Sequence, residues 1–260
     1  MRIVTAMALI LSVSSGFSGL ANSQESAGKT DSAIQNARER QRISESTAAE
    51  KGEDSERKSA DKDGWKPMLP PKGMEGWKIT DFGGQGKVEW DGKTLVLERG
   101  EPLTGIHSER KDFPKTDYEI RFEAQRVEGR DFFCGLTFPV GEGFCSLITG
   151  GWGGGVVGLS NIDGFDASEN ETSAYKEFEN NHWYSFHVVV SQKEVVVTID
   201  DKEFVRLERE GHEFSTRIEV SICEPLGYCV FGTKAAVRNW KWRPLANKVD
   251  AKDSTDSVER

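Results

Sequence analysis

The stretch FFCGLTFPVGEGFCSLITGGWGGGVVGLSNIDGFDASENETS, residues 132–173, decides the fold. Its first half holds two short runs rich in aromatic and β-branched residues, 132–138 and 144–149, separated by the five residues 139–143. A connection of this length that contains glycine is typical of a β-hairpin. We therefore predict two antiparallel strands here, followed by a third strand over residues 156–160.

A glycine cluster with one tryptophan, GGWGGG at 150–155, precedes the third strand. Glycine reaches left-handed backbone conformations and permits close approach of a ligand, so this segment displays the large flat ring of Trp152. Aromatic residues of a β-sandwich usually pack in its core, but this setting favours stacking on a sugar. We name Trp152, Gly151 and Gly153 as candidate substrate-binding residues.

The third strand leads into a loop, 161–172, that carries four carboxylates within nine positions. A solvated loop whose Asp and Asn residues shape turns explains this composition. Binding of a divalent cation, catalytic or purely structural, or proton transfer on a substrate explains it as well. The candidate catalytic residues are Asp163, Asp166, Glu169 and Glu171, with His107 and His182 as proton donors, and Asn161 and Asn170 join the candidate substrate-binding residues.

The remaining chain from residue 65 is a series of short apolar runs broken by Gly, Asp and Pro. Residues 117–127 alternate strictly between apolar and polar, which predicts one half-buried antiparallel strand. Further strands are predicted at 77–80, 87–90, 94–98, 182–190, 194–199, 203–207, 217–223, 228–232 and 235–242. Short strands with turns every 8–12 residues predict an all-β, two-sheet antiparallel sandwich, a jelly roll of the concanavalin A-like kind.

The two ends of the chain differ from this central part. Residues 1–23 combine Arg2, an apolar run and small residues up to Ser23, which predicts a signal peptide and export to the periplasm or the extracellular space. An uncleaved anchor is the alternative. Residues 24–63 are charged and poor in apolar side chains, which predicts a disordered linker, and 246–260 resembles it. The folded domain is predicted to span 64–245, without a later stretch of the ~18 apolar residues that a membrane helix needs.

The formal net charge of −9 argues against nucleic acid and anionic membranes as partners, because phosphate binding requires a basic surface. Four cysteines in an exported chain permit disulfides, and we expect the local bridges Cys134–Cys145 and Cys223–Cys229. Buried free thiols are the alternative. The absence of a CxxC pair argues against structural zinc, and the glycine cluster lacks the GK[ST] ending of a phosphate-binding loop.

Three motifs, DFFCGLTF (131–138), GGWGG (150–154) and IDGFDASENET (162–172), together with a tryptophan-led strand at 183–190, give the chain a family resemblance. It resembles the 3-keto-disaccharide hydrolase domain family of the concanavalin A-like lectin/glucanase superfamily, over residues 77–245, and most closely an exported planctomycete-type branch. The resemblance implies a two-sheet jelly roll that cleaves glycosides oxidised at C3. No catalytic residue of that family is matched to a position here, so the candidate residues rest on their own chemistry.

The sequence therefore predicts an exported enzyme that acts on 3-keto-glycosides or disaccharides by hydrolysis or by elimination and hydration. A ketone at C3 acidifies the hydrogen on C2, so this chemistry needs a base, a stabiliser for the enolate and an acid for the leaving group. A divalent cation is one way to stabilise the enolate. A lectin-like module that binds carbohydrate without catalysis, and a structural module of the cell envelope, are the alternatives.

Overall fold

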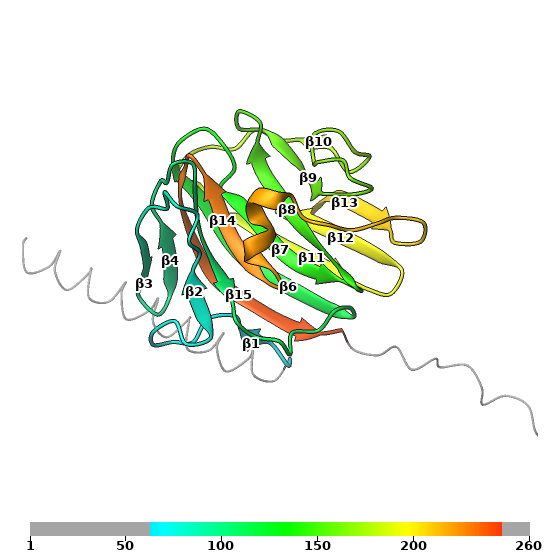
Figure 1. Cartoon of the computed structure of the whole chain (residues 1–260), viewed down its shortest axis with the longest axis horizontal. Coiled ribbons are helices and arrows are strands. Elements are labelled where there is room, and N and C mark those ends of the chain that lie inside the picture. The colour runs from blue at the N-terminus through cyan, green and yellow to red at the C-terminus, as the bar shows by residue number, and fades with distance from the viewer. Residues whose placement is uncertain (1–62, 246–260) are drawn as a thin grey trace, which may run out of the picture. The chain divides into compact units, whose positions relative to one another are not determined.

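The computed structural model describes residues 63–245. The predicted signal peptide, 1–23, and tail, 246–260, lie outside the described residues, as does the predicted linker, 24–63, except for its last residue. Within the described part, no helix is long and apolar enough to cross a membrane. The described chain is built almost entirely of antiparallel strands (Figure 1).

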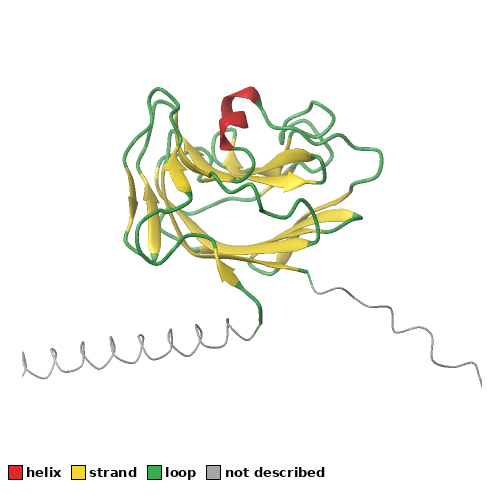
Figure 2. Cartoon of the chain, turned by 60° about the horizontal axis from the view of Figure 1, so that its bottom comes forward, coloured by secondary structure: helices red, strands yellow, loops and turns green. Residues whose placement is uncertain are grey.

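The strands form two sheets that face each other, which confirms the predicted two-sheet antiparallel sandwich (Figure 2). In the first sheet, β1 (Lys66–Pro67) pairs with β15. The order of its other strands is β13 (Lys202–Glu208), β12 (Glu194–Ile199), β11 (Tyr184–Val190), β6 (Tyr118–Glu128), β15 (Lys234–Pro244), β4 (Thr94–Leu97) and β3 (Val88–Trp90).

The second sheet carries the glycine cluster and the acidic loop at one side. Its strand order is β10 (Ala174–Tyr175), β9 (Val156–Ser160), β8 (Gly143–Gly151), β7 (Cys134–Val140), β14 (Gly227–Phe231), β5 (Leu103–Ser108) and β2 (Trp77–Ile79). A short 3-10 helix, η1 (Ile218–Cys223), lies on the outside of this sheet (Figure 2).

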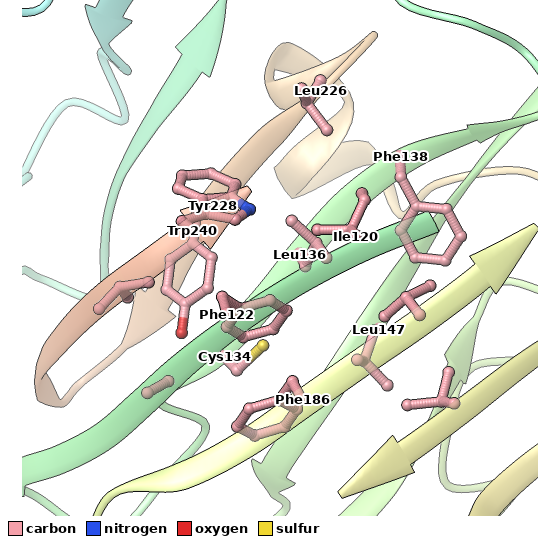
Figure 3. Packing of buried hydrophobic residues seen from close by; sticks show 14 of the residues in the cluster. Ile120, Phe122, Cys134, Leu136, Phe138, Leu147, Phe186, Leu226, Tyr228 and Trp240 are labelled. Atoms are coloured by element: carbon pink, nitrogen blue, oxygen red, sulfur yellow. The ribbon is translucent and has the colours of Figure 1, made fainter. Parts of the chain in front are cut away.

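The alternation in β6 and β11 produces the core as the sequence predicts. Tyr118, Ile120, Phe122 and Ala124 of β6 are buried, and the polar residues between them lie on the outer face. The Phe122 ring stacks on Phe186 with centroids 4.6 Å apart. Figure 3 shows these rings packed with aliphatic side chains of the second sheet. Each sheet thus presents one apolar face to the other.

Two local predictions need correction. The hairpin of β7 and β8 is present, but Val140 pairs directly with Gly143, so the turn has two residues and the predicted five-residue loop is wrong. Residues 217–223 were predicted as a strand, yet they form η1. Its buried side chains, Val220 and Cys223, are three positions apart, which is the spacing of one 3-10 turn.

Candidate functional site

The glycine cluster forms the turn between β8 and β9. Trp152 has a left-handed backbone, φ 50°, and its side chain is 46% exposed. A Cβ on Gly155 would lie 2.1 Å from the ring of Tyr175, and a Cβ on Gly154 would lie 3.0 Å from the carbonyl oxygen of Arg130. These glycines therefore let β10 and the chain after β6 close in on the turn.

The acidic loop begins at the opposite end of β9 and is held by one asparagine. The Asn170 amide donates to the carbonyl oxygens of Leu159, Phe165 and Asp166, at 2.7, 3.1 and 2.8 Å, and its Oδ1 accepts from the amide and hydroxyl of Thr172. Its polar atoms are thus committed to the loop itself. Within this structure the side chain of Asn170 shapes the loop, and its role in substrate binding stays a prediction.

Two further predicted residues are also engaged in local structure. Asn161 exchanges two backbone hydrogen bonds with Ser215, and its Oδ1 accepts from the Ser160 hydroxyl at 3.0 Å. Asp166 accepts from the amide and hydroxyl of Ser168 through Oδ1, and its Oδ2 lies 2.9 Å from the Arg217 guanidinium. Asp166 thereby ties the loop to the segment before η1.

Asp163 and Glu171 meet around a histidine that the sequence did not single out. His212 Nδ1 lies 2.7 Å from Asp163 Oδ2, and His212 Nε2 lies 3.4 Å from Glu171 Oε1. The Glu213 amide donates to Asp163 Oδ1 at 2.7 Å. This backbone donor, and then His212, hold the pKa of Asp163 below its ordinary value. A carboxylate so placed orients the imidazole and favours the proton on Nδ1.

A groove of about 1000 Å³ is lined by this histidine and by no residue of the acidic loop itself. It is called the acidic-loop groove because His212 contacts that loop. Its lining includes the β7–β8 turn, the β11–β12 turn and the segment from Glu208 to Phe214, which contains His212. Arg209 lines it as well and donates to the Thr116 hydroxyl at 2.8 Å and to the Ser191 carbonyl. The groove therefore combines a histidine held by a carboxylate with several acidic side chains and a fixed cation.

A second groove of about 550 Å³, here called the glycine-turn groove, lies at the other end of the sandwich. It is lined by Gly153 and Gly154, the residues after β10, the start of β11 and Asp200 of the β12–β13 turn. Because β11 and β12 run from one groove to the other, the two grooves lie at opposite strand ends. Neither of these two grooves is lined by Trp152 or by a residue of the acidic loop, so neither is a hollow that the two share.

The other predicted histidines and acids lie apart from His212. His182 lines the glycine-turn groove, with its ring 4.6 Å from that of Tyr184. His107 is on β5, separated from β9 by three strands, and bonds to Thr80 at 2.9 Å. Burial lowers the pKa of His107. Glu169 is exposed on the acidic loop.

All four cysteines are buried free thiols in this structure, so the two predicted bridges are not formed. A Cys134–Cys145 bridge is ruled out by the register, which pairs Cys134 with Thr149 and Cys145 with Phe138, four positions away along the ladder. Burial raises the pKa of both thiols to about 12. Cys223 and Cys229 belong to one small cluster beneath η1.

No group of three or more His, Cys, Asp or Glu side chains within residues 63–245 is arranged to hold a metal ion. The acids around His212 instead use their oxygens on the imidazole, a backbone amide and, in Asp166, an arginine.

Comparison with known proteins gives distant structural likenesses only. No family model and no curated protein matches the chain. A provisionally assigned glycosyl hydrolase from Parabacteroides distasonis is 13% identical, with 72% of this chain and 97% of that chain covered and a TM-score of 0.48. The Crh5 transglycosylase is 12% identical, with 70% of this chain and 84% of that chain covered and a TM-score of 0.47. Carbohydrate-binding module CBM66 from Bacillus subtilis is 12% identical, with 65% of this chain and 95% of that chain covered and a TM-score of 0.41. Likenesses this distant leave the function to be inferred from the chain's own residues.

Proposed function

We propose that this protein is an exported enzyme that cleaves glycosides carrying a ketone at C3 of the sugar. The observation that supports the proposal is His212, whose two ring nitrogens face Asp163 and Glu171 at the edge of the acidic-loop groove. Histidine is the side chain whose ordinary pKa is nearest to neutral pH, so it is suited to removing a weakly acidic proton from carbon.

The proposed reaction has two stages that balance as a hydrolysis. The base removes the proton from C2, the C2–H electrons form an enolate with the C3 ketone, and the enolate expels the oxygen bonded to C1. The leaving oxygen takes a proton, which produces an alcohol and an unsaturated keto sugar. Water then adds its oxygen to C1, and C2 regains a proton. No oxidant or reductant is consumed, because the ketone is already present in the substrate.

Each stage has a side chain suited to it. With its Nδ1 proton directed at Asp163, His212, which lines the groove, has the lone pair of Nε2 available to accept a proton. Glu171 faces that nitrogen across 3.4 Å and is exposed, so it is placed to pass a proton to the leaving oxygen. The guanidinium of Arg209 lies in the same groove and supplies positive potential for the enolate oxygen. Asp163 is a positioning residue in this scheme.

The test is cleavage of 4-nitrophenyl 3-keto-β-glucoside by the exported chain. The rate is measured as the release of nitrophenol. We expect turnover by the wild-type protein and loss of at least a hundredfold in kcat/KM for His212→Gln, since general base catalysis contributes about 10²–10⁴-fold. The matched control is His107→Gln, which changes a histidine three strands away from β9. In D₂O the freshly formed keto sugar should carry one deuterium at C2.

Three results would contradict the proposal. The first is that the wild-type chain releases no nitrophenol. The second is that His212→Gln retains the wild-type rate. The third is that the product forms without deuterium at C2, which would indicate direct displacement at C1. A control incubation of the keto sugar alone in D₂O corrects for exchange that does not involve the enzyme.

A carbohydrate-binding module without catalysis is the second candidate, and one observation favours it. Tyr175 lines the glycine-turn groove and is exposed, and the exposed Trp152 precedes Gly153, which lines the same groove, at the end of the sandwich away from His212. Exposed rings at a groove are suited to stacking on a sugar. Saturable binding of a glycoside by the wild-type chain, with no product after prolonged incubation, would support this function over the enzyme.

A further inference from the structure

The glycine-turn groove has a buried cation in its lining. Arg126 of β6 is only 7% exposed, and its guanidinium donates to three neutral acceptors. They are Asn180 Oδ1 at 2.6 Å, the Phe178 carbonyl oxygen at 2.5 Å and the Gly154 carbonyl oxygen at 3.5 Å. An arginine has five N–H donors, so two of them have no acceptor among the contacts within residues 63–245.

No carboxylate forms an ion pair with Arg126 among residues 63–245, although its guanidinium lies over the Phe133 ring at 5.9 Å from the centroid. Asp131 is the carboxylate that acts on it electrostatically, but the Asp131 oxygens accept from the backbone amides of Phe132 at 2.8 Å and Gly153 at 3.4 Å. Burial lowers the pKa of Arg126. A buried guanidinium that no carboxylate contacts directly favours an anion that enters the groove.

An exposed aromatic ring, that of Tyr175, lines the groove together with this cation. The Tyr175 side chain is 71% exposed, and its ring lies over the backbone of Gly155, where a Cβ would collide with it. The Lys176 amide donates to the Gly155 carbonyl oxygen at 2.9 Å and fixes this part of the turn. Trp152 lies in the same turn. The rings offer the flat apolar surface on which the face of a pyranose stacks.

The remaining charges of the groove are divided between the two signs. Arg130 is exposed and lines the groove, and Lys176 lies 4.0 Å from Asp200. Glu177 and Glu179 are exposed at its border. Carboxylates at a border accept hydrogen bonds from sugar hydroxyls, whereas Arg126 and Arg130 are placed to bind an acidic group.

We propose that the glycine-turn groove binds a pyranose that carries a carboxylate, a uronic acid residue. The sugar face stacks on Tyr175 and Trp152, and the carboxylate accepts hydrogen bonds from Arg126 and Arg130. This site lies at the opposite end of the sandwich from His212 and does not depend on the chemistry proposed there.

The experiment is calorimetric titration of the exported chain with methyl β-glucuronide and with methyl β-glucoside, which differ only in the carboxylate. We expect the glucuronide to bind at least tenfold more tightly, and the preference to shrink in 0.5 M NaCl because salt screens charge. Arg130→Gln should reduce the preference while weak binding of the glucoside remains. Tyr175→Ala should weaken both ligands at least tenfold.

Arg217→Gln is the matched control, because it removes an exposed arginine near the acidic loop and should leave both affinities unchanged. Arg126→Gln serves as a further variant if its circular dichroism matches that of the wild type, and Arg130→Gln tests the proposal in either case. Equal affinity for the two ligands, no binding of either, or full affinity in Tyr175→Ala would overturn the proposal. The His212→Gln variant should bind the glucuronide normally, so failure of the catalytic proposal leaves this test intact.

Discussion

Glu119 is the buried acid of the first sheet, and its replacement by glutamine tests the electrostatics of that sheet. Its side chain lies on the outer face of β6 and is 7% exposed. Oε1 accepts from Arg243 Nε at 2.6 Å, and Oε2 lies 2.5 Å from His187 Nε2. Arg243 in turn stacks on Trp65, 4.5 Å from its ring centroid. Glu119→Gln keeps the shape of this cluster and removes its one negative charge.

The expected loss follows from these two contacts. A hydrogen bond to a charged group contributes about 1.5–3 kcal/mol, and the partial exposure of Arg243 and His187 places each contact below that range through screening. Together they give about 2–3 kcal/mol at pH 7. For a domain of this size, that corresponds to a fall in Tm of roughly 4–12 °C.

The pH dependence has a definite sign. Burial raises the pKa of Glu119, but hydrogen bonds from Arg243 and His187 outweigh burial, so its pKa is lowered. A carboxyl group whose pKa is lower in the folded state than in the unfolded state stabilises the fold at any pH above its unfolded pKa, about 4.3 for Glu. This contribution is lost as the pH falls through the pKa of the folded state. Burial also lowers the pKa of His187, so its protonation below pH ~6.5 costs additional stability.

Thermal unfolding followed by circular dichroism between pH 3.5 and 8 measures these effects. The Tm difference between Glu119→Gln and the wild type should persist from pH 7 to about pH 5, because Glu119 also supports protonation of His187, and should shrink as the pH falls below about 4. The control is Glu98→Gln, which breaks a more exposed pair with Lys234 and should cost less than about 1 kcal/mol. If the difference is the same at pH 3.5 and pH 7, the charge of Glu119 is not its cause.

Three further changes have expected outcomes. Asp163→Asn should lower kcat/KM on the keto-glucoside about 10²–10⁴-fold and leave Tm unchanged. The reason is that the asparagine amide would donate to Nδ1 of His212 and move the imidazole proton to Nε2. A loss of kcat/KM below threefold would contradict this. Gly155→Ala should displace the exposed Tyr175 ring and weaken glucuronide binding at least tenfold in calorimetry, and retained affinity would show that the ring is not required. Tyr118→Phe removes the hydroxyl that donates to a buried carbonyl of β7 and should cost about 1–3 kcal/mol in urea unfolding, whereas Tyr175→Phe should cost nothing measurable.

The sheets were predictable because their signal is local. In β6 the alternation of apolar and polar residues specifies which face is buried, and β9 begins and ends at the residues predicted. The hairpin of β12 and β13 follows from Asp200-Asp201, which both adopt the left-handed backbone of a tight turn. Such features depend on neighbours within a few positions, so they are visible in the sequence.

Segment 217–223 shows where the local signal fails. Ile218, Val220 and Ile222 alternate with polar residues, as in a strand, but the segment pairs with no strand and packs over the outside of the second sheet. There its contacts follow the i, i+3 spacing of Val220 and Cys223, and the side chains of Ile218 and Ile222 stay exposed. Period-two alternation identifies a strand only where a ladder partner is available.

His212 could not be found by sequence reasoning for a similar reason. It follows β13 in a Gly-His-Glu segment without any recognisable motif, and its partner Asp163 is 49 positions earlier in the chain. The acidic loop did give a signal, because two of its four acids meet at that histidine. Which residue meets these acids depends on the order of the strands in space, and residue spacing in the sequence does not reveal that order.

The separation of Trp152 from Asp163 has a geometric cause. The two residues are close in sequence, but β9 lies between them. Because a strand is extended, the residues before and after it lie at its two opposite ends. The grooves are separated in the same way. Tyr184 lines one and Gln192 the other, with the length of β11 between them, about 25 Å at roughly 3.3 Å per residue. One sugar ring cannot contact both ends. Recognition by Trp152 and proton transfer by His212 must therefore involve two sugar rings far apart in one glycan, or two different ligands.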